Sequence, residues 1–172
     1  MRCVVVPFAE SHADAFAQAA RRSRRLHGRF AHPPTTPDAA LDLARRRQGP
    51  SHLGFVVVDG ATGTLQGYVE VTQIVHGAFR SAYLGYHVFS GHERRGVMTA
   101  ALRQVIAHCQ RSLKLNRLEA NIQPENVASI ALVRSLGFRR EGCSPAYLRI
   151  GGRWRDHERW AWLAPSRRAA AD

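Results

Sequence analysis

Lysine is almost absent from this chain, because Lys114 is the only one among 25 basic residues. The three cysteines, Cys3, Cys109 and Cys143, show no C-x-x-C spacing, which excludes a disulfide scaffold and a cysteine zinc site. No cluster of His, Cys, Asp or Glu has the spacing of metal ligands. The longest apolar stretch near the N-terminus, residues 4–8, is too short for a signal peptide or a membrane span. These absences predict a cytoplasmic protein with no metal and no membrane association.

The charged residues that are present are mostly basic. The 172 residues include 25 Lys+Arg and 13 Asp+Glu, which gives a formal net charge of +12. A positive field concentrates anionic ligands, so it predicts a nucleic acid, a ribosome or a phosphorylated cofactor as a partner. The length and the hydrophobic content of 45% fit one globular domain. We expect that domain at residues 1–164, followed at 165–172 by a short basic, alanine-rich tail that is disordered.

The hydrophobic pattern predicts an α/β fold with a mixed sheet. The expected order is strand, two helices, three antiparallel strands, helix, strand, helix and two strands. Ser11 is the expected N-cap of the first helix, with Leu26 on its apolar side, and Thr36-Pro37 opens the second. The elements are expected at 3–8, 11–29, 37–47, 52–59, 64–75, 82–89, from about 95 through 109, at 117–122, at 126–136, and from 138 onward as a hairpin turning at Gly151-Gly152.

The first informative stretch is the junction at residues 87–102, H-V-F-S-G-H-E-R-R-G-V-M-T-A-A-L, where a strand ends and a helix begins. The first N–H groups of a helix have no partner within it and suit a phosphate. Gly96 lets a ligand approach the backbone, and Arg94 and Arg95 add positive charge. The motif is neither a Walker loop nor a dinucleotide fingerprint, so a bound diphosphate here points to coenzyme A. The alternative is a helix opened by a solvated arginine pair.

The second informative stretch is residues 121–142, N-I-Q-P-E-N-V-A-S-I-A-L-V-R-S-L-G-F-R-R-E-G. A strand ends in a polar loop, and a helix begins at Asn126. Ala128 and Ser129 are small enough to permit close approach, and Gly137 is expected to end the helix. Taken alone, Asn126 is an N-cap and Ser129 a neutral residue of the first turn. Two helix N-termini offered by neighbouring strands indicate a shared ligand site.

With these motifs in order, the chain resembles the GNAT superfamily of acetyl-CoA-dependent N-acetyltransferases, and most of all the bacterial ribosomal-protein-alanine N-acetyltransferases. The resemblance runs from about residue 4 to residue 162 and includes Y-L-R-I-G-G-R-W-R-D-H near the C-terminus. It implies the GNAT fold, acetyl-CoA as the cofactor, and a protein N-terminus, specifically that of a ribosomal protein, as the acceptor. It also implies a monomer or a homodimer.

The resemblance implies a cofactor site at the first junction. The family's diphosphate loop falls on residues 93–98, so backbone N–H groups from Arg94 to Thr99 are implied to hold the diphosphate. The preceding backbone is implied to pair with pantetheine, Asn126 to contact the pantetheine arm, and Ser129 to lie near the sulfur. The implied cofactor residues are Val88, Phe89, Ser90, Arg94, Arg95, Gly96, Val97, Met98, Thr99, Asn126 and Ser129. Two departures put cofactor affinity in question: Glu93 replaces Gln or Arg, and Met98 replaces a small residue.

The implied reaction is direct attack of an amine on the thioester. An α-amino group has a reference pKa of about 7.7–8.0, so a weak base suffices at neutral pH. Related enzymes carry a carboxylate where this chain has Ser90, so Glu70 is the candidate base, with the alternative that it is a surface acid. His87 is a weaker candidate, and Ser129 is the candidate proton donor.

The last hairpin is implied to border the acceptor groove. Its aromatic residues, Tyr147 and Trp154, are expected mostly in the core, and Asp156 and His157 should face opposite sides of their strand. The arginines before residue 48 could contact ribosomal RNA or water. Two other functions stay open: acetylation of a small amine, and a ribosome- or RNA-binding module without turnover. The positive charge of the chain argues against a polyamine as the small amine, because the two would repel each other.

Overall fold

The computed structural model describes residues 3–165 of the chain, so most of the tail expected at 165–172 lies outside the described residues. Its strands form one eight-stranded sheet. The strands are β1 (Cys3–Pro7), β2 (Gln48–Gly49), β3 (His52–Asp59), β4 (Leu65–Val75), β5 (Ser81–Val88), β6 (Arg117–Ile122), β7 (Arg139–Ile150) and β8 (Arg153–Leu163). The helices are a 3-10 turn (Glu10–His12), α1 (Ala13–Arg22), α2 (Arg24–His27), α3 (Pro37–Arg46), α4 (Val97–Arg111) and α5 (Val127–Ser135).

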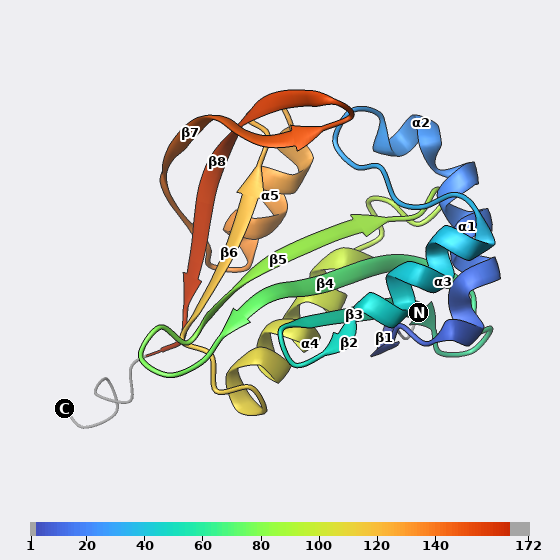
Figure 1. Ribbon diagram of the computed structural model, residues 1–172, viewed down its shortest axis with the longest axis horizontal. Coiled ribbons are helices and arrows are strands. Elements are labelled where there is room, and N and C mark those ends of the chain that lie inside the picture. The colour runs from blue at the N-terminus through green and yellow to red at the C-terminus, as the bar shows by residue number, and fades with distance from the viewer. Residues whose placement is uncertain (1–2, 166–172) are drawn as a thin grey trace.

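The sheet divides where β5 meets β6. Its order is β1-β3-β4-β5-β6-β8-β7, with β2 paired to β3, and every neighbouring pair is antiparallel except β5 and β6. These two parallel strands pair only through Ser81–Tyr83 and Arg117–Glu119. Beyond those residues they diverge, as Figure 1 shows. The divergence leaves strand edges without a neighbouring strand in the middle of the sheet, and this is where the site lies.

Alternation along the strands builds a core on each face of the sheet. Val57 and Val69 point to one face, where they pack with α4. Val56 and Tyr68 point to the other, where they pack with α1 and α3. The helical spacing of the apolar residues in α4 was therefore a correct predictor of that helix and its buried face.

The first helical region differs from its prediction. Ser11 is not an N-cap, because it lies within the 3-10 turn, and the imidazole Nδ1 of His12 accepts the Ala9 N–H at 3.0 Å instead. The helix is also interrupted at Ser23 and ends at His27 rather than near residue 29. Leu26 is 38% exposed and not on a buried face.

The later elements follow the sequence prediction closely. Thr36 caps α3, Asn126 caps α5 by accepting the Ser129 N–H at 3.2 Å, and Gly137 follows α5 with φ +87°. The last hairpin turns at Gly151 and Gly152. The short strand β2 was not expected, and β5 ends one residue earlier than expected. Among residues 3–165, no helix is both long and apolar enough to cross a membrane.

Candidate functional site

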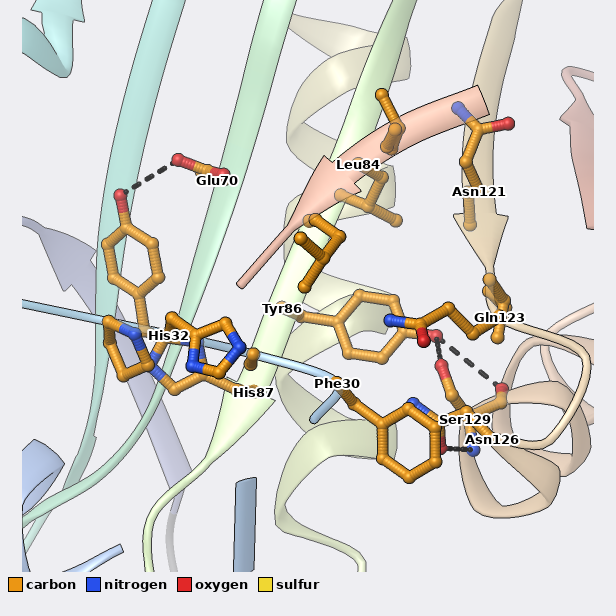
Figure 2. Close-up of a pocket in the computed structure, with 18 of the residues that line it drawn as sticks. Phe30, His32, Glu70, Leu84, Tyr86, His87, Asn121, Gln123, Asn126 and Ser129 are labelled. Atoms are coloured by element: carbon orange, nitrogen blue, oxygen red, sulfur yellow. Dashed lines mark hydrogen bonds between the residues drawn. The ribbon is translucent and has the colours of Figure 1, made fainter. Parts of the chain in front are cut away.

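Two grooves meet where β5 and β6 separate. The groove beside the start of α4, here called the cofactor groove, has a volume of about 520 Å³. The second, here called the acceptor groove, has a volume of about 370 Å³ and lies between α3, β4 and the last hairpin. Residues common to both grooves join them into one channel: Phe30, Ala31, Tyr86, His87, Asn126 and Ser129. Figure 2 shows several of these around the acceptor groove.

The start of α4 fits a diphosphate. Gly96 has φ +73° and no atom within 4 Å of where a Cβ would stand, so its backbone is open to a ligand. Arg94 also has a positive φ, of 58°, and such alternating conformations turn successive N–H groups into one concave surface. The N–H groups at the start of the helix have no helical partner. Arg94, Gly96, Val97, Met98 and Thr99 line the groove, whereas Arg95 is exposed and does not.

The two departures from the family motif are accommodated locally. The Glu93 carboxylate turns back onto its own loop, where it accepts the Gly91 N–H at 2.7 Å, and these backbone hydrogen bonds lower the pKa of Glu93. The Met98 side chain is 8% exposed and points into the core. Its sulfur stands 2.8 Å from where a Cβ of Gly67 would be, so the glycine on β4 makes room for the larger residue.

The end of β5 is held by α1 and α2. The Val88 carbonyl lies 2.8 Å from His27 Nε2, and the Ser90 N–H donates to Ser23 Oγ at 2.9 Å. The Phe89 side chain is only 2% exposed and packs on Phe16, so it is not available to a ligand. Of the three residues, Val88 lines the cofactor groove.

Tyr86 and Ser129 face each other across the gap between β5 and α5. Their hydroxyl oxygens are 2.6 Å apart, as Figure 2 shows. Burial raises the pKa of Tyr86 to about 12, so the phenol keeps its proton at neutral pH. Ser129 thus stands at the junction of the grooves with a second hydroxyl behind it, which is an arrangement that can deliver a proton.

Glu70 lies in the acceptor groove and is held from one side. Its Oε2 accepts from Arg47 Nε at 2.7 Å and from the Tyr68 hydroxyl at 3.3 Å. Burial raises the pKa of Tyr68, so this phenol is a donor. The other carboxylate oxygen, Oε1, lies 3.0 Å from where a Cβ of Gly85 would stand. The missing side chain at Gly85 therefore lets Glu70 extend over β5 with one oxygen unengaged.

The far wall of the acceptor groove comes from β6 and the last hairpin. Asn121 stands across the groove from Glu70 in Figure 2, and its buried Oδ1 has no hydrogen-bond partner. His157 is buried beside it, while Asp156 is exposed and accepts the Ala146 N–H at 2.8 Å. The two do not pair, as the strand alternation predicted. Trp154 is 63% exposed, so the expectation of a core position is wrong for this residue.

His87 is not suited to be a base. Its ring is packed among Phe16, Tyr68, Phe89 and His27. Burial lowers the pKa of His87 to about 3, so the ring is a poor proton acceptor at neutral pH.

Sequence reasoning missed four residues of the site: Ser23, His27, Arg47 and Tyr86. The first three sit in an arginine-rich segment whose charge suggested a solvated surface. Tyr86 lies one residue before the junction at residues 87–102, and in the sequence it fits the ordinary alternation of a strand. Only the distances between distant segments reveal these four.

The fold and the paired grooves define an acyl-CoA-dependent acetyltransferase, and comparison with known proteins agrees. Residues 2–139 match the family model described as an acetyltransferase (GNAT) domain. The chain belongs to this family. The match confirms the family and fold predicted from the sequence, and with them the enzyme class and the acetyl-CoA cofactor of that class.

Several relatives carry specific names. The chain is 37% identical to the [ribosomal protein uS5]-alanine N-acetyltransferase of Escherichia coli over 111 residues, 64% of this chain and 57% of the relative. It is 35% identical to YjcK of Bacillus subtilis over 64% of this chain and 61% of that protein. These matches thus cover less than two thirds of either relative.

Among solved structures, a ribosomal-protein-S5-alanine acetyltransferase from Vibrio fischeri superposes with a TM-score of 0.83 at 26% identity, covering 95% of this chain and 93% of that chain. Mycobacterium smegmatis RimJ, solved in complex with CoA-disulfide, gives 0.85 at 27% identity over 99% of this chain and 84% of the other.

Proposed function

We propose that the protein transfers the acetyl group of acetyl-CoA to the N-terminal α-amine of a ribosomal protein in the cytoplasm. The observation that carries the choice of acceptor is the charge of the acceptor groove. Glu70 is the single carboxylate among the described residues that line it, and it is already paired with Arg47. One unengaged carboxylate oxygen suits one amine. Relatives whose names specify a target are named as ribosomal-protein acetyltransferases, which supports a ribosomal protein as the molecule that carries this amine.

The same observation argues against a polyamine acceptor. A polyamine carries several positive charges, and each needs a carboxylate in a groove that removes it from water. Among residues 3–165, the other charged or titratable residues that line the acceptor groove are Arg47, two tyrosines and three histidines. The net charge of +12 also opposes the approach of a polycation.

The cofactor is assigned to the cofactor groove. Acetyl-CoA supplies the acetyl group as an activated thioester. The N–H groups from Arg94 to Thr99 are proposed to bind its diphosphate, and Asn126 to contact the pantetheine arm beside the backbone of β5. Phe89, Ser90 and Arg95 do not line the cofactor groove, and both backbone groups of Phe89 and the Ser90 N–H already have partners within the protein.

Proton transfer is assigned to two residues at opposite ends of the junction. Glu70 Oε1 is proposed to accept a hydrogen bond from the acceptor amine and to take its proton. Because an α-amine is partly neutral near pH 7, a carboxylate tied to Arg47 is a sufficient base. As the amine nitrogen bonds to the acetyl carbon and the C–S bond breaks, Ser129 Oγ is proposed to give its proton to the leaving thiolate and to regain one from solvent. The Tyr86 hydroxyl, 2.6 Å away, stays protonated and holds the serine oxygen in place by its hydrogen bond.

The alternative of a binding module without turnover rested on Glu93 and Met98. Glu93 bonds its own loop and Met98 is buried beside Gly67, so neither blocks the start of α4. We therefore favour an active enzyme.

The first experiment is calorimetric titration of the purified protein with acetyl-CoA, followed by acetylation of peptides analysed by mass spectrometry. Peptides that copy the N-termini of ribosomal proteins should gain one acetyl group on the α-amine. The same peptides with a blocked N-terminus and an internal lysine should not, and neither should spermidine. Acetylation of spermidine in preference to the peptides would contradict the proposed acceptor, and absence of acetyl-CoA binding would contradict the proposed enzyme.

Replacing Ser129 tests its assignment. Ser129→Ala should lower kcat about tenfold, which corresponds to about 1.4 kcal/mol, with the Kd of acetyl-CoA unchanged. Tyr86→Phe should have a smaller effect in the same direction, because Ser129 keeps its own proton. If Ser129→Ala weakens acetyl-CoA binding while kcat holds, Ser129 is a binding residue and not a proton donor.

A further inference from the structure

The backbone at the end of β5 is fixed by groups that belong to the protein itself. Val88, Phe89 and Ser90 offer six backbone N–H and C=O groups, and four of them have internal partners. The Phe89 N–H donates to the Gln66 carbonyl at 2.8 Å, and the Phe89 carbonyl accepts the His92 N–H at 3.2 Å. The remaining two of these bonds, at the Val88 carbonyl and the Ser90 N–H, are made by side chains of the helical segment before residue 28.

Those two side chains are spaced four residues apart. Residues so spaced share one side of a helix, and here both are buried: Ser23 is 0% exposed and His27 6%. The Ser23 hydroxyl donates its own proton to the Ala19 carbonyl at 2.7 Å, which leaves its lone pair for the Ser90 N–H. Ser23 also lies at the interruption between α1 and α2, where the chain bends toward β5.

The bond made by His27 has a defined direction. A carbonyl can only accept, so His27 must carry its proton on Nε2, 2.8 Å from the Val88 oxygen. Burial lowers the pKa of His27, and the neighbouring ring of His87 is 4.8 Å away between ring centroids, so the imidazole is neutral. A neutral Nε2–H donor is therefore part of the folded structure.

We propose that Ser23 and His27 are positioning residues for the acetyl-transfer reaction, an inference that rests on the proposed function. Together they engage the Val88 carbonyl and the Ser90 N–H and fix the strand end a few residues before the proposed diphosphate loop at residues 93–98. The strand edge and the loop then present their remaining backbone groups in one fixed geometry. Ser23 lines neither groove, and His27, which lines the cofactor groove, has its Nε2–H engaged by the Val88 carbonyl, so both residues act through the strand.

The helical segment also links the two grooves. Three residues after His27, the chain reaches Phe30 and Ala31, which line both grooves, and His32, which lines the acceptor groove. The contact of His27 with Val88 therefore sets the distance between the wall of the acceptor groove and the strand that carries the cofactor. Loss of that contact should misalign the two substrates more than it weakens the binding of either substrate.

The test compares four variants of the full chain. His27→Leu and Ser23→Ala each remove one bond, while His27→Gln keeps an N–H donor at a similar reach. Thr36→Ala is the control, since it removes the cap of α3, where Thr36 Oγ1 accepts from the Ala39 N–H, and Thr36 lines neither groove. The free energy of unfolding is measured in urea, the Kd of acetyl-CoA by calorimetry, and kcat with both substrates saturating.

We expect His27→Leu and Ser23→Ala to lower kcat about tenfold to a hundredfold, with a smaller rise in the Kd of acetyl-CoA. His27→Gln should recover most of kcat, and Thr36→Ala should lose stability but keep kcat. Since Ser23→Ala deletes one oxygen, it serves as the test if His27→Leu does not fold.

Three results would overturn the inference. A wild-type kcat in folded Ser23→Ala and His27→Leu would contradict the positioning roles and leave the proposed function intact. A His27→Gln variant whose kcat is no higher than that of His27→Leu would do the same. A wild-type protein that binds no acetyl-CoA would contradict both the positioning roles and the proposed function.

Discussion

At the scale of single residues, the space above Gly85 is filled by the carboxylate of the neighbouring strand. Glu70 Oε1 and Cγ lie 3.0 and 3.1 Å from where a Cβ of Gly85 would stand. In Gly85→Ala the Glu70 side chain must move, and its ion pair with Arg47 must move with it. We expect the KM for a peptide acceptor to rise about tenfold, which corresponds to about 1.4 kcal/mol, while the Kd of acetyl-CoA stays constant.

Steady-state kinetics and calorimetry check this prediction. Gly49→Ala on β2 is the matched control, because no atom lies within 4 Å of its Cβ position and Gly49 lines neither groove. An unchanged KM in Gly85→Ala would remove Glu70 from acceptor binding.

A second single residue, His87, makes stability depend on pH. Its pKa is about 3 in the folded protein against 6.5 when unfolded, so below pH 6.5 the unfolded chain binds a proton that the folded protein does not. Stability from this group is complete above pH 6.5 and declines as pH falls toward 3, by about 1.4 kcal/mol per pH unit. His27 acts in the same direction.

Urea unfolding at pH 7.5 and 5.5 measures this slope. In His87→Phe the loss of stability between the two pH values should be smaller than in the wild type. Equal losses in the two proteins would show that His87 ionises freely when folded.

At the scale of elements, the start of α4 offers a comparison between two glycines in the same conformation. Gly96 and Gly63 have φ of +73° and +71°, and neither has an atom within 4 Å of its Cβ position. Leucine at either position strains the backbone by about 1–2 kcal/mol. Only Gly96→Leu places a side chain over the proposed diphosphate site, so it alone should raise the Kd of acetyl-CoA, by about tenfold or more. Equal Kd values in the two variants would mean that the diphosphate binds elsewhere.

The elements differ in how far the sequence foretold them. Helix α4 was predictable because seven apolar residues repeat at helical spacing and pack on one sheet face. The two caps Thr36 and Asn126 were predictable because capping is a local contact. The break at Ser23 was not, since its hydroxyl bonds Ser90, 67 residues further along the chain.

The site followed the same division. The diphosphate loop and the helix at Asn126 are contiguous motifs and were recognisable by their order. The environment of Glu70 depends on Arg47 and Gly85, which lie on other elements, so the sequence offered the carboxylate but not its ion pair. Met98 looked unfavourable for the same reason, because its partner Gly67 lies on β4. Glu93 differs, since it bonds Gly91 within its own loop, a local contact that the sequence analysis did not foresee.

At the scale of the whole molecule, the positive charge predicts that RNA binding and peptide acetylation differ in their dependence on salt. Residues 21–29 contain five arginines and no acid, and all five are exposed. If this segment contacts RNA, affinity for RNA should fall steeply as salt rises from 50 to about 200 mM, because each neutralised phosphate releases a counterion. Acetylation of a short uncharged peptide should change much less over that range. Filter binding and kinetics at matched salt measure the two, and RNA affinity that ignores salt would exclude the arginines as its basis.

The short pairing of β5 with β6 also has a mechanical consequence. Three residues on each strand make the backbone pairing between the part of the sheet from β1 to β5 and the part from β6 to β8, while the core against α4 runs across both parts. A ligand that lies between the diverging ends of β5 and β6 supplies hydrogen-bond partners that the polypeptide lacks there. It thereby joins the two parts of the sheet over a greater length. Ligand binding should therefore also stabilise these strand edges against local opening. The amides along the open edges beyond Tyr83 and Glu119 should exchange slowly with solvent only while the ligand is in place.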